Sequence, residues 1–344
     1  MAEQCDLSPN APTPEQLTAF VRQLGPCTSA QPTFTELSDG FNHVNYVCEG
    51  GPAELTCDGE SGVLLPERIV IRYAQRPNDS TDCALRREHA MLQFLDERLP
   101  PGTVPKSYAC RPSPILGGHA VLLEEFVEGT VKAEMNSLTL DETKALARTV
   151  SSLHAITDAR FSSQPGGQAD SCGDYATYIR ALLYKSVHMR LHVLGMEAHE
   201  IAGGLLVRGI RKLEGMLAAP ELNDRRSTYT VVHGDLNPRN FIIRPDGSVT
   251  LIDAEGIRFG DPANDNAYLF VNNGWKQSYR EPYYGAYRAP ATCGDVIGRS
   301  AVYDLLNSLD DIVWVTAKRL ENPGQADWYK EYRKRHQTLE RLAA

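Results

Sequence analysis

The segment that most constrains the fold of this chain is a polar loop followed by a predicted β-hairpin. The loop reads His233-Gly234-Asp235-Leu236-Asn237-Pro238-Arg239-Asn240, and the segment after it ends at Leu251-Ile252-Asp253. Two short runs of β-forming residues, 241–243 and 249–252, flank the turn residues Pro245-Asp246-Gly247-Ser248. Because a hairpin returns the chain on itself, we expect Asn240 and Asp253 to lie close together.

The polar residues of this segment have the spacing that phosphoryl transfer from a metal-bound nucleotide requires. Asp235 precedes Asn240 by 5 positions, the interval found in the catalytic loop of kinases, and Asp253 follows 13 residues later. A carboxylate such as Asp235 can accept the proton of an attacking hydroxyl group. Amide and carboxylate oxygens, here those of Asn240 and Asp253, can bind Mg²⁺. A simple turn with a capping aspartate is the alternative interpretation.

The composition argues against several classes of protein. The 344 residues are 42% hydrophobic and 23% charged, as in ordinary globular proteins, and no apolar run is long enough to span a membrane. The net charge of −9, from 35 basic and 44 acidic residues, argues against nucleic-acid binding and is compatible with a cationic small-molecule acceptor. The N-terminus lacks the features of a secretory signal, and the eight cysteines include no C-x-x-C pair, so we expect a cytoplasmic protein with reduced thiols.

The predicted elements change character along the chain. The first part contains mostly strands and few helices: helices at 14–24 and 81–95, strands at 33–37, 44–48, 68–73 and 120–126, and a turn-rich loop at 57–61. After a connector at 127–130 the pattern is mostly helical, with breaks near Gly195 and Gly203. This order predicts an α+β fold of two lobes, a β-rich N-terminal lobe at 1–126 and a mainly helical C-terminal lobe at 127–344, which is the plan of a kinase.

The stretch from Val231 to Phe270 resembles the aminoglycoside phosphotransferase and choline kinase superfamily of small-molecule kinases. It reads V-V-H-G-D-L-N-P-R-N-F, then L-I-D-A-E, then G-D-P-A-N-D-N-A-Y. The resemblance implies a protein-kinase-like fold, ATP and Mg²⁺ as cofactors, Asp235 as the catalytic base, and Asn240 and Asp253 as the Mg²⁺ ligands. Asp261 and Asp265 match a motif that braces the catalytic loop in relatives, although capping of the following helix is an equally good interpretation.

Weaker similarity in the N-terminal lobe implies a nucleotide site. Gly40 lies in a segment that resembles the nucleotide-covering loop, although an ordinary hairpin fits it as well. Arg72 stands where the kinase strand V-A-I-K carries lysine, and Glu88 on the following helix is the candidate partner carboxylate. A surface cation and an exposed helical glutamate are the alternatives. Glu125 and Val127 would contact the adenine through backbone groups.

The resemblance implies that the acceptor binds the C-terminal lobe near the catalytic loop. Acidic and aromatic residues after Asp253 are therefore candidates, although core packing or solvent exposure is the commoner explanation for most of them. The pair Asp310-Asp311 is the most suggestive, because it interrupts a largely apolar helical run. The other candidates are Glu255, Asp261, Asp304, Trp275, Tyr279, Tyr283, Tyr284, Tyr287 and Trp314.

The resemblance implies an ATP-dependent phosphotransferase that acts on a hydroxyl group of a small molecule. An aminoglycoside or a related antibiotic is the leading acceptor, which would make the protein a resistance enzyme. A metabolic kinase for choline, ethanolamine, an amino alcohol or a sugar is the first alternative. A catalytically silent nucleotide-binding pseudokinase is the second, supported only by Arg72 and the single loop glycine. Kinases of this kind work as monomers or homodimers, and we expect one of these states here.

Overall fold

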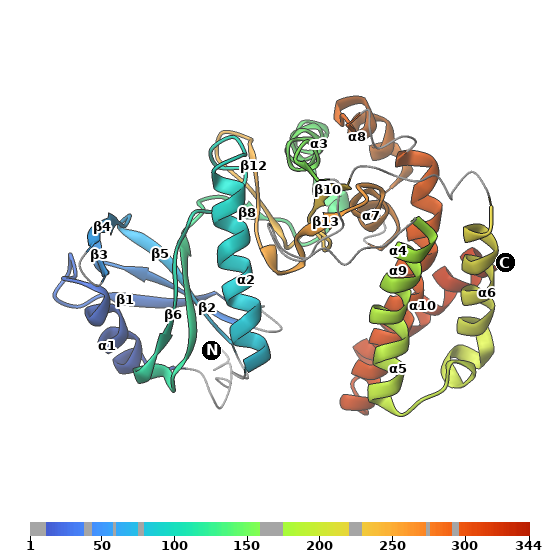
Figure 1. The fold of residues 1–344 in the computed structure, drawn as a ribbon, viewed down its shortest axis with the longest axis horizontal. Helices are drawn as coiled ribbons and strands as arrows, with labels where there is room; N and C mark the ends of the chain where they lie inside the picture. Colours follow the sequence, from blue (N-terminus) through green and yellow to red (C-terminus); the bar gives the residue numbers. More distant parts are fainter. Residues whose placement is uncertain are drawn as a thin grey trace. The chain divides into compact units, whose positions relative to one another are not determined.

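A computed structural model of the chain describes residues 12–37, 43–57, 60–74, 79–158, 175–219, 229–272, 276–290 and 296–344. The chain divides into two compact units (Figure 1). The first consists of Met1–Val131 with Asn240–Gly256, and the second of Lys132–Arg239 with Ile257–Ala344. The first unit is built on an antiparallel sheet and the second is mainly helical, which confirms the predicted α+β class. None of the helices in the described ranges is both long and apolar enough to cross a membrane.

The first unit is organised around a five-stranded antiparallel sheet with the strand order β1-β2-β5-β7-β6. Its strands are β1 (Thr33–Leu37), β2 (His43–Glu49), β5 (Arg68–Ala74), β6 (Ser107–Ser113) and β7 (His119–Glu125). The central strand β5 carries Arg72, which is opposite Asn45 of β2 and Leu122 of β7. Arg72 is therefore fixed by strands on both sides.

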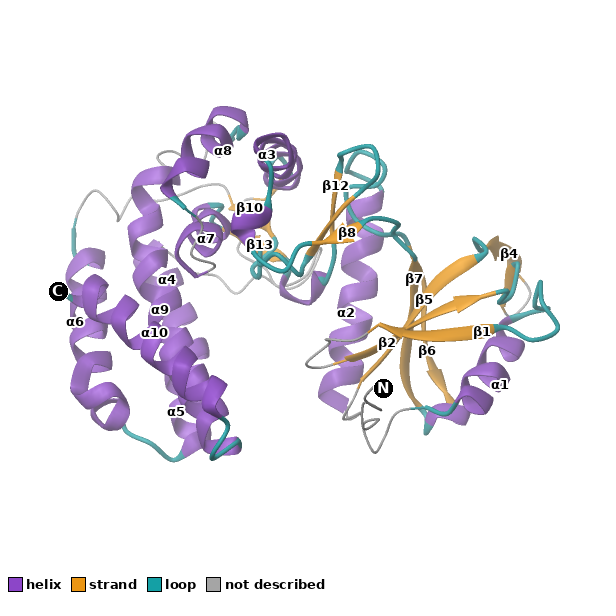
Figure 2. Ribbon diagram, turned by 180° about the vertical axis from the view of Figure 1, so that it is seen from behind, coloured by secondary structure: helices purple, strands orange, loops and turns teal. Residues whose placement is uncertain are grey.

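Two helices cover the two faces of this sheet (Figure 2). The helix α1 (Pro14–Leu24) begins with the predicted capping box of Thr13 and Gln16, and its apolar side packs against one face. The helix α2 (Asp79–Asp96) packs against the other face, where its Leu85 contacts Leu122. Because side chains alternate along β5 and β7, Arg72 and Glu124 share the face that α2 covers.

The predicted hairpin is present and belongs to the first unit. Its strands β11 (Phe241–Ile243) and β12 (Val249–Leu251) pair antiparallel, and the short β8 (Thr130–Val131) pairs with β11. The turn between β11 and β12 is closed by a hydrogen bond from Gly247 N to Arg244 O, and Gly247 has a φ of +82°. At the open end, Ile252 N donates to Asn240 O over 2.9 Å, so Asn240 lies beside the residue that precedes Asp253.

The second unit packs helices around a small sheet of strand order β13-β10-β9. The strands are β9 (Thr157–Asp158), β10 (Tyr229–Val232) and β13 (Arg258–Gly260). The long helix α9 contacts α6, α7 and α10. The helices are α3 (Leu140–His154), α4 (Tyr175–Leu183), α5 (Met189–Leu194), α6 (Leu205–Leu217), α7 (Ala263–Ala267), α8 (Arg280–Ala286), α9 (Val296–Glu321) and α10 (Ala326–Ala343).

Several elements differ from the predictions. The edge strand β6 contains Pro112, which weakens its strand pattern but is tolerated at a sheet edge. Part of the loop expected at 57–61 belongs to a two-stranded ribbon of β3 (Glu54–Cys57) and β4 (Glu60–Leu64).

The expected break at Gly195 is confirmed by its φ of +62°. The remaining short helical segments are η1 (Pro114–Leu116), η2 (Met135–Ser137), η3 (Tyr184–His188), η4 (Ala198–Gly204), η6 (Ala254–Gly256), η7 (Tyr268–Asn272) and η8 (Gln277–Tyr279).

Candidate functional site

The loop that carries Asp235 follows β10, whose four residues are all buried. Gly234 has a φ of +82°, a conformation that strongly favours glycine, and it turns the chain sharply between His233 and Asp235. Asp235 itself is partly exposed. The loop therefore presents a carboxylate at the end of a rigid, buried strand.

The carboxylate of Asp265, on α7, anchors this loop. Its Oδ2 accepts a hydrogen bond from His233 N over 2.7 Å, and its Oδ1 accepts one from Gly234 N over 2.8 Å. Burial alone would raise the pKa of Asp265, but hydrogen bonds from His154 and Gly234 outweigh burial, and the pKa is lowered. The prediction that Asp265 braces the loop is confirmed.

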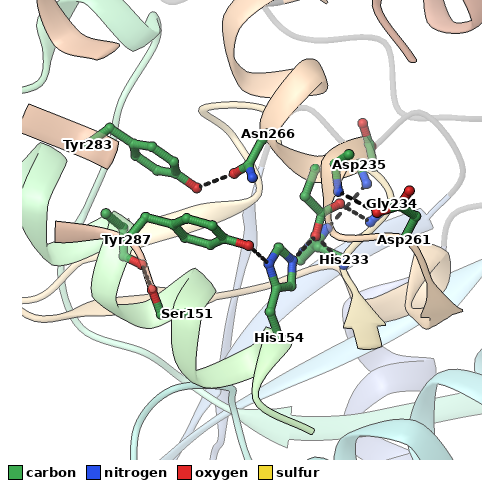
Figure 3. Close-up of polar contacts among 12 residues, drawn as sticks. Ser151, His154, His233, Gly234, Asp235, Asp261, Asn266, Tyr283 and Tyr287 are labelled. Carbon is green, nitrogen blue, oxygen red and sulfur yellow. Dashed lines mark hydrogen bonds and ion pairs between the residues drawn. The ribbon is translucent and has the colours of Figure 1, made fainter. Parts of the chain in front are cut away.

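His154 extends the anchor, a role that no sequence motif indicates. Its Nε2 lies 3.0 Å from Asp265 Oδ2, and its Nδ1 lies 2.7 Å from the Tyr287 hydroxyl (Figure 3). Since an ionised carboxylate can only accept, Nε2 donates to Asp265. A histidine at the end of an amphipathic helix was visible in the sequence, but its partners are 111 and 133 residues away.

The side chain of Tyr268 hydrogen-bonds to Asp235. Burial raises the pKa of Tyr268 well above its ordinary value, and the negative charges of Asp235 and Asp311 raise it further. The phenol therefore stays protonated and donates to the carboxylate. Tyr268 begins η7, a π-helical segment directly after α7. It is the last residue of the G-D-P-A-N-D-N-A-Y stretch, but the sequence did not predict a role for it.

The predicted pair Asp310 and Asp311 lies on α9, and each carboxylate has an arginine partner. Arg190 Nη1 lies 2.8 Å from Asp310 Oδ1, and Arg335 Nη1 lies 2.6 Å from Asp311 Oδ2. Burial raises the pKa of Asp310 to about 7, although Arg190 acts in the opposite direction. The negative charges of both aspartates also raise the pKa of Tyr268, the residue that hydrogen-bonds to Asp235.

The other acceptor candidates differ in their surroundings. Both oxygens of Asp261 bind Arg299, at 2.7 Å to Nε and 2.8 Å to Nη2. Tyr283 and Tyr287 are buried and stacked on each other, so they form part of the core of the second unit. Glu255 is exposed in the first unit. Trp275 lies outside the described residues.

In the first unit, Arg72 binds three carboxylates. Its Nη1 lies 2.6 Å from Glu88 Oε1 and 3.6 Å from Glu124 Oε2, and its Nη2 lies 3.3 Å from Asp253 Oδ1. The predicted pair of Arg72 and Glu88 is therefore present, whereas the contact with Glu124 was not predicted. Burial raises the pKa of Glu88 to about 8, with Arg72 opposing it, and burial also raises the pKa of Glu124. Arg72 stays charged because three carboxylates surround it.

Asp253 combines an unusual backbone with a partly exposed carboxylate. Its φ of +63° lies in the left-handed region, which is uncommon for residues other than glycine and frequent at functional sites. The hydrogen bond between Ile252 N and Asn240 O keeps the buried Asn240 next to this turn. A carboxylate and an amide group thus come from neighbouring parts of the chain, and both carry the hard oxygen donors that Mg²⁺ prefers.

The remaining nucleotide-site candidates lie at the end of β7. Glu125 N donates to Lys106 O over 2.8 Å, so the amide of Glu125 is used within the sheet. Val127 follows β7, and its side chain is buried. Gly40 lies outside the described residues.

Two comparisons use the amino-acid sequence of the chain. The model of the phosphotransferase enzyme family matches residues 67–296, which include the Arg72 cluster, the Asp235 loop and the hairpin. A search of curated proteins finds no match.

Solved structures share the fold along almost the whole chain. APH(2")-IIia in its GDP and kanamycin complex has a TM-score of 0.62 and 17% identity, over 95% of this chain and 97% of that one. A thermostable mutant of aminoglycoside phosphotransferase APH(4)-Ia, in complex with ADP and hygromycin B, has a TM-score of 0.62 and 15% identity, with the same coverage of 95% and 97%. A choline/ethanolamine kinase family protein from Mesorhizobium loti has a TM-score of 0.55 and 14% identity, over 95% and 94%.

Proposed function

The chain belongs to the phosphotransferase enzyme family, and we propose that it transfers the γ-phosphoryl group of ATP to a hydroxyl group of a small molecule. The observation that carries this proposal is the turn at Asp253. A strained aspartate faces the charged end of Arg72 and follows a hairpin whose other end carries Asn240. A carboxylate, an amide and a guanidinium in one unit are the groups that bind a nucleotide triphosphate with its metal.

Asp235 is the proposed catalytic base. Its carboxylate accepts the proton of the acceptor hydroxyl while the hydroxyl oxygen forms a bond to the γ-phosphorus. The bond from the γ-phosphorus to the β–γ bridging oxygen breaks, and ADP leaves with the electron pair. The hydrogen bond from Tyr268 and the anchoring of the loop by Asp265 fix the direction of this carboxylate.

Asn240 and Asp253 are the proposed ligands of Mg²⁺. The bound ion would offset the negative charge of the β- and γ-phosphate oxygens. No group of three His, Cys, Asp or Glu side chains in the described part of the chain could hold a metal by itself. Mg²⁺ commonly binds one or two protein carboxylates and takes its other ligands from phosphates and water.

Arg72, held by Glu88, is the proposed phosphate-binding cation, and Nη2 is the nitrogen directed toward Asp253. Gly40, the carbonyl group of Glu125 and the N–H of Val127 are proposed to complete the nucleotide site. ATP is the proposed donor, although the similar structures include complexes with ADP and with GDP. Since MgATP is abundant in the cytoplasm, we propose that the enzyme acts there.

An aminoglycoside or related antibiotic is the proposed acceptor, which would give the enzyme a role in resistance. Asp310 and Asp311 support a cationic acceptor, because their negative charges act on Tyr268, which hydrogen-bonds to Asp235. Both would have to exchange an arginine partner for a substrate amine. A choline or ethanolamine acceptor is the second candidate, favoured by the fold shared with the Mesorhizobium loti protein.

Phosphate transfer read by product mass tests this function. The purified protein is incubated with MgATP and with kanamycin, hygromycin B, choline, ethanolamine or a sugar, alongside Asp235→Ala. We expect one acceptor to gain the mass of a phosphoryl group with the wild-type protein and not with the variant. The absence of transfer, together with the absence of any Asp235-dependent ATP hydrolysis, would contradict the proposal.

A further inference from the structure

Arg72 meets carboxylates from three separate elements of the first unit. Glu88 comes from α2, Glu124 from β7, and Asp253 follows β12. The contacts divide between the two ends of the guanidinium group. Nη1 faces Glu88 at 2.6 Å and Glu124 at 3.6 Å, whereas Nη2 faces Asp253 at 3.3 Å. One end is therefore held inside the unit, and the other is directed at the turn of Asp253.

Arg72 offsets the cost of burying the carboxylates of Glu88 and Glu124. Their side chains are 0% and 7% exposed, so neither carboxylate can rely on water. Glu88 Oε2 and Glu124 Oε1 are buried and make no hydrogen bond with other described residues. A buried carboxylate without a cationic partner is strongly unfavourable. Arg72 is the cation that contacts both.

This arrangement also explains why the central strand carries arginine where kinases usually carry lysine. A guanidinium group has five N–H donors on three nitrogens, so Nη1 can serve Glu88 and Glu124 while Nη2 serves another group. An ammonium group has one nitrogen at the end of a shorter side chain. Its three N–H donors share that nitrogen, so it has no second end that could be directed at Asp253 while the first holds Glu88 and Glu124.

We propose that Glu124 is a positioning residue, which together with Glu88 holds Nη1 of Arg72 and makes arginine the required cation at position 72. The proposal rests on the proposed function for one part only, the role of Nη2 toward the nucleotide phosphates. Glu124 acts through Arg72 and does not contact the reacting atoms. Its contact with Nη1 restricts the rotation of the Arg72 side chain, so that Nη2 stays directed at the turn of Asp253.

A double-mutant cycle of Arg72→Lys and Glu124→Gln tests this pairing. The melting temperature and the calorimetric Kd for MgATP are measured for the wild type, both single variants and the double variant. Arg72→Lys leaves Glu124 buried without its partner, so we expect a lower melting temperature and MgATP binding weakened by about tenfold. Glu124→Gln removes the buried charge, so the double variant should recover at least about threefold of that loss and part of the melting temperature.

Glu49→Gln is the matched control, because Glu49 is an exposed carboxylate of the same sheet, opposite Arg68 on β5. Its effects should add to those of Arg72→Lys without rescue. Additive effects of Arg72→Lys and Glu124→Gln would overturn the inference, and so would an Arg72→Lys variant that matches the wild type. A wild-type protein that does not bind MgATP would contradict the proposed function instead, and the melting temperatures would still decide the pairing.

Discussion

Tyr268 is a residue whose importance can be judged from its contact with the proposed base. Its hydroxyl donates to Asp235, and a neutral hydroxyl that donates to a carboxylate fixes the direction of that carboxylate. Replacing Tyr268 by phenylalanine keeps the ring and removes only the donor. We expect kcat to fall by roughly tenfold, the value of one hydrogen bond to a charged group, with an unchanged Kd for MgATP.

Steady-state turnover and calorimetry on Tyr268→Phe check this expectation. Tyr303→Phe is the matched control, because the Tyr303 hydroxyl is buried and has no hydrogen-bond partner in the described ranges. Equal kcat values for Tyr268→Phe and Tyr303→Phe would rule out a positioning role for Tyr268.

Single residues of the site were predictable where a local motif marks them. Asp265 follows from the motif that begins at Gly260, and Glu88 follows from its place on the helix after the Arg72 strand. Glu124, Tyr268 and His154 were not predicted, because each acts through a partner distant in the sequence. Arg72 and Glu124, for example, are brought together only by the register of β5 and β7.

Two glycine turns in two different elements test which backbone conformation matters for turnover. Gly234 and Gly247 both have a φ of +82°, one in the Asp235 loop and one at the tip of the β11–β12 hairpin. Alanine at either position costs about 1–2 kcal/mol of strain. We expect similar losses in melting temperature for Gly234→Ala and Gly247→Ala, but a large loss of kcat only for Gly234→Ala. Turnover that falls equally in both variants would refute the special role of the loop.

The elements that were predicted correctly carry strong local signals. The capping box of α1 and the turn residues of the β11–β12 hairpin fix those elements from within a few residues. The edge strand β6 was missed because it contains Pro112 and lacks regular alternation, and only its pairing with β7 stabilises it. The π-helical segment at Tyr268 has no sequence signal of its own.

Sequence patterns could not predict which residues belong to each of the two units. The order of strands and helices predicted the α+β class. It could not show that residues 240–256 fold with a unit whose main part ends at Val131, because that association depends on contacts such as β8 with β11.

A partly buried aspartate of α9, Asp304, gives the stability of the protein a pH dependence. Burial raises the pKa of Asp304 to about 7, although Arg280 and Arg341 act in the opposite direction. At pH values between the ordinary pKa of an aspartate and about 7, Asp304 binds more proton in the folded state than in the unfolded state. The contribution of Asp304 to the free energy of unfolding therefore falls as the pH rises toward 7.

Replacement of Asp304 by asparagine removes this titration. We expect the melting temperature of Asp304→Asn, relative to the wild type, to be higher at pH 8 than at pH 5. Asp141→Asn, at a side chain that is 96% exposed, is the control and should follow the wild type at both pH values. Parallel pH profiles for Asp304→Asn and the wild type would contradict the assignment.

Asp235 is proposed to act in the chemical step, while Asp253 is proposed to hold the metal-bound nucleotide. The most direct test measures both turnover and the calorimetric Kd for MgATP in Asp235→Ala and Asp253→Ala. We predict that Asp235→Ala lowers kcat by about 10²- to 10⁴-fold with a nearly unchanged Kd. Asp253→Ala should weaken MgATP binding by at least about tenfold, or about 1.4 kcal/mol. Loss of MgATP binding in Asp235→Ala, or unchanged binding in Asp253→Ala, would contradict the claim.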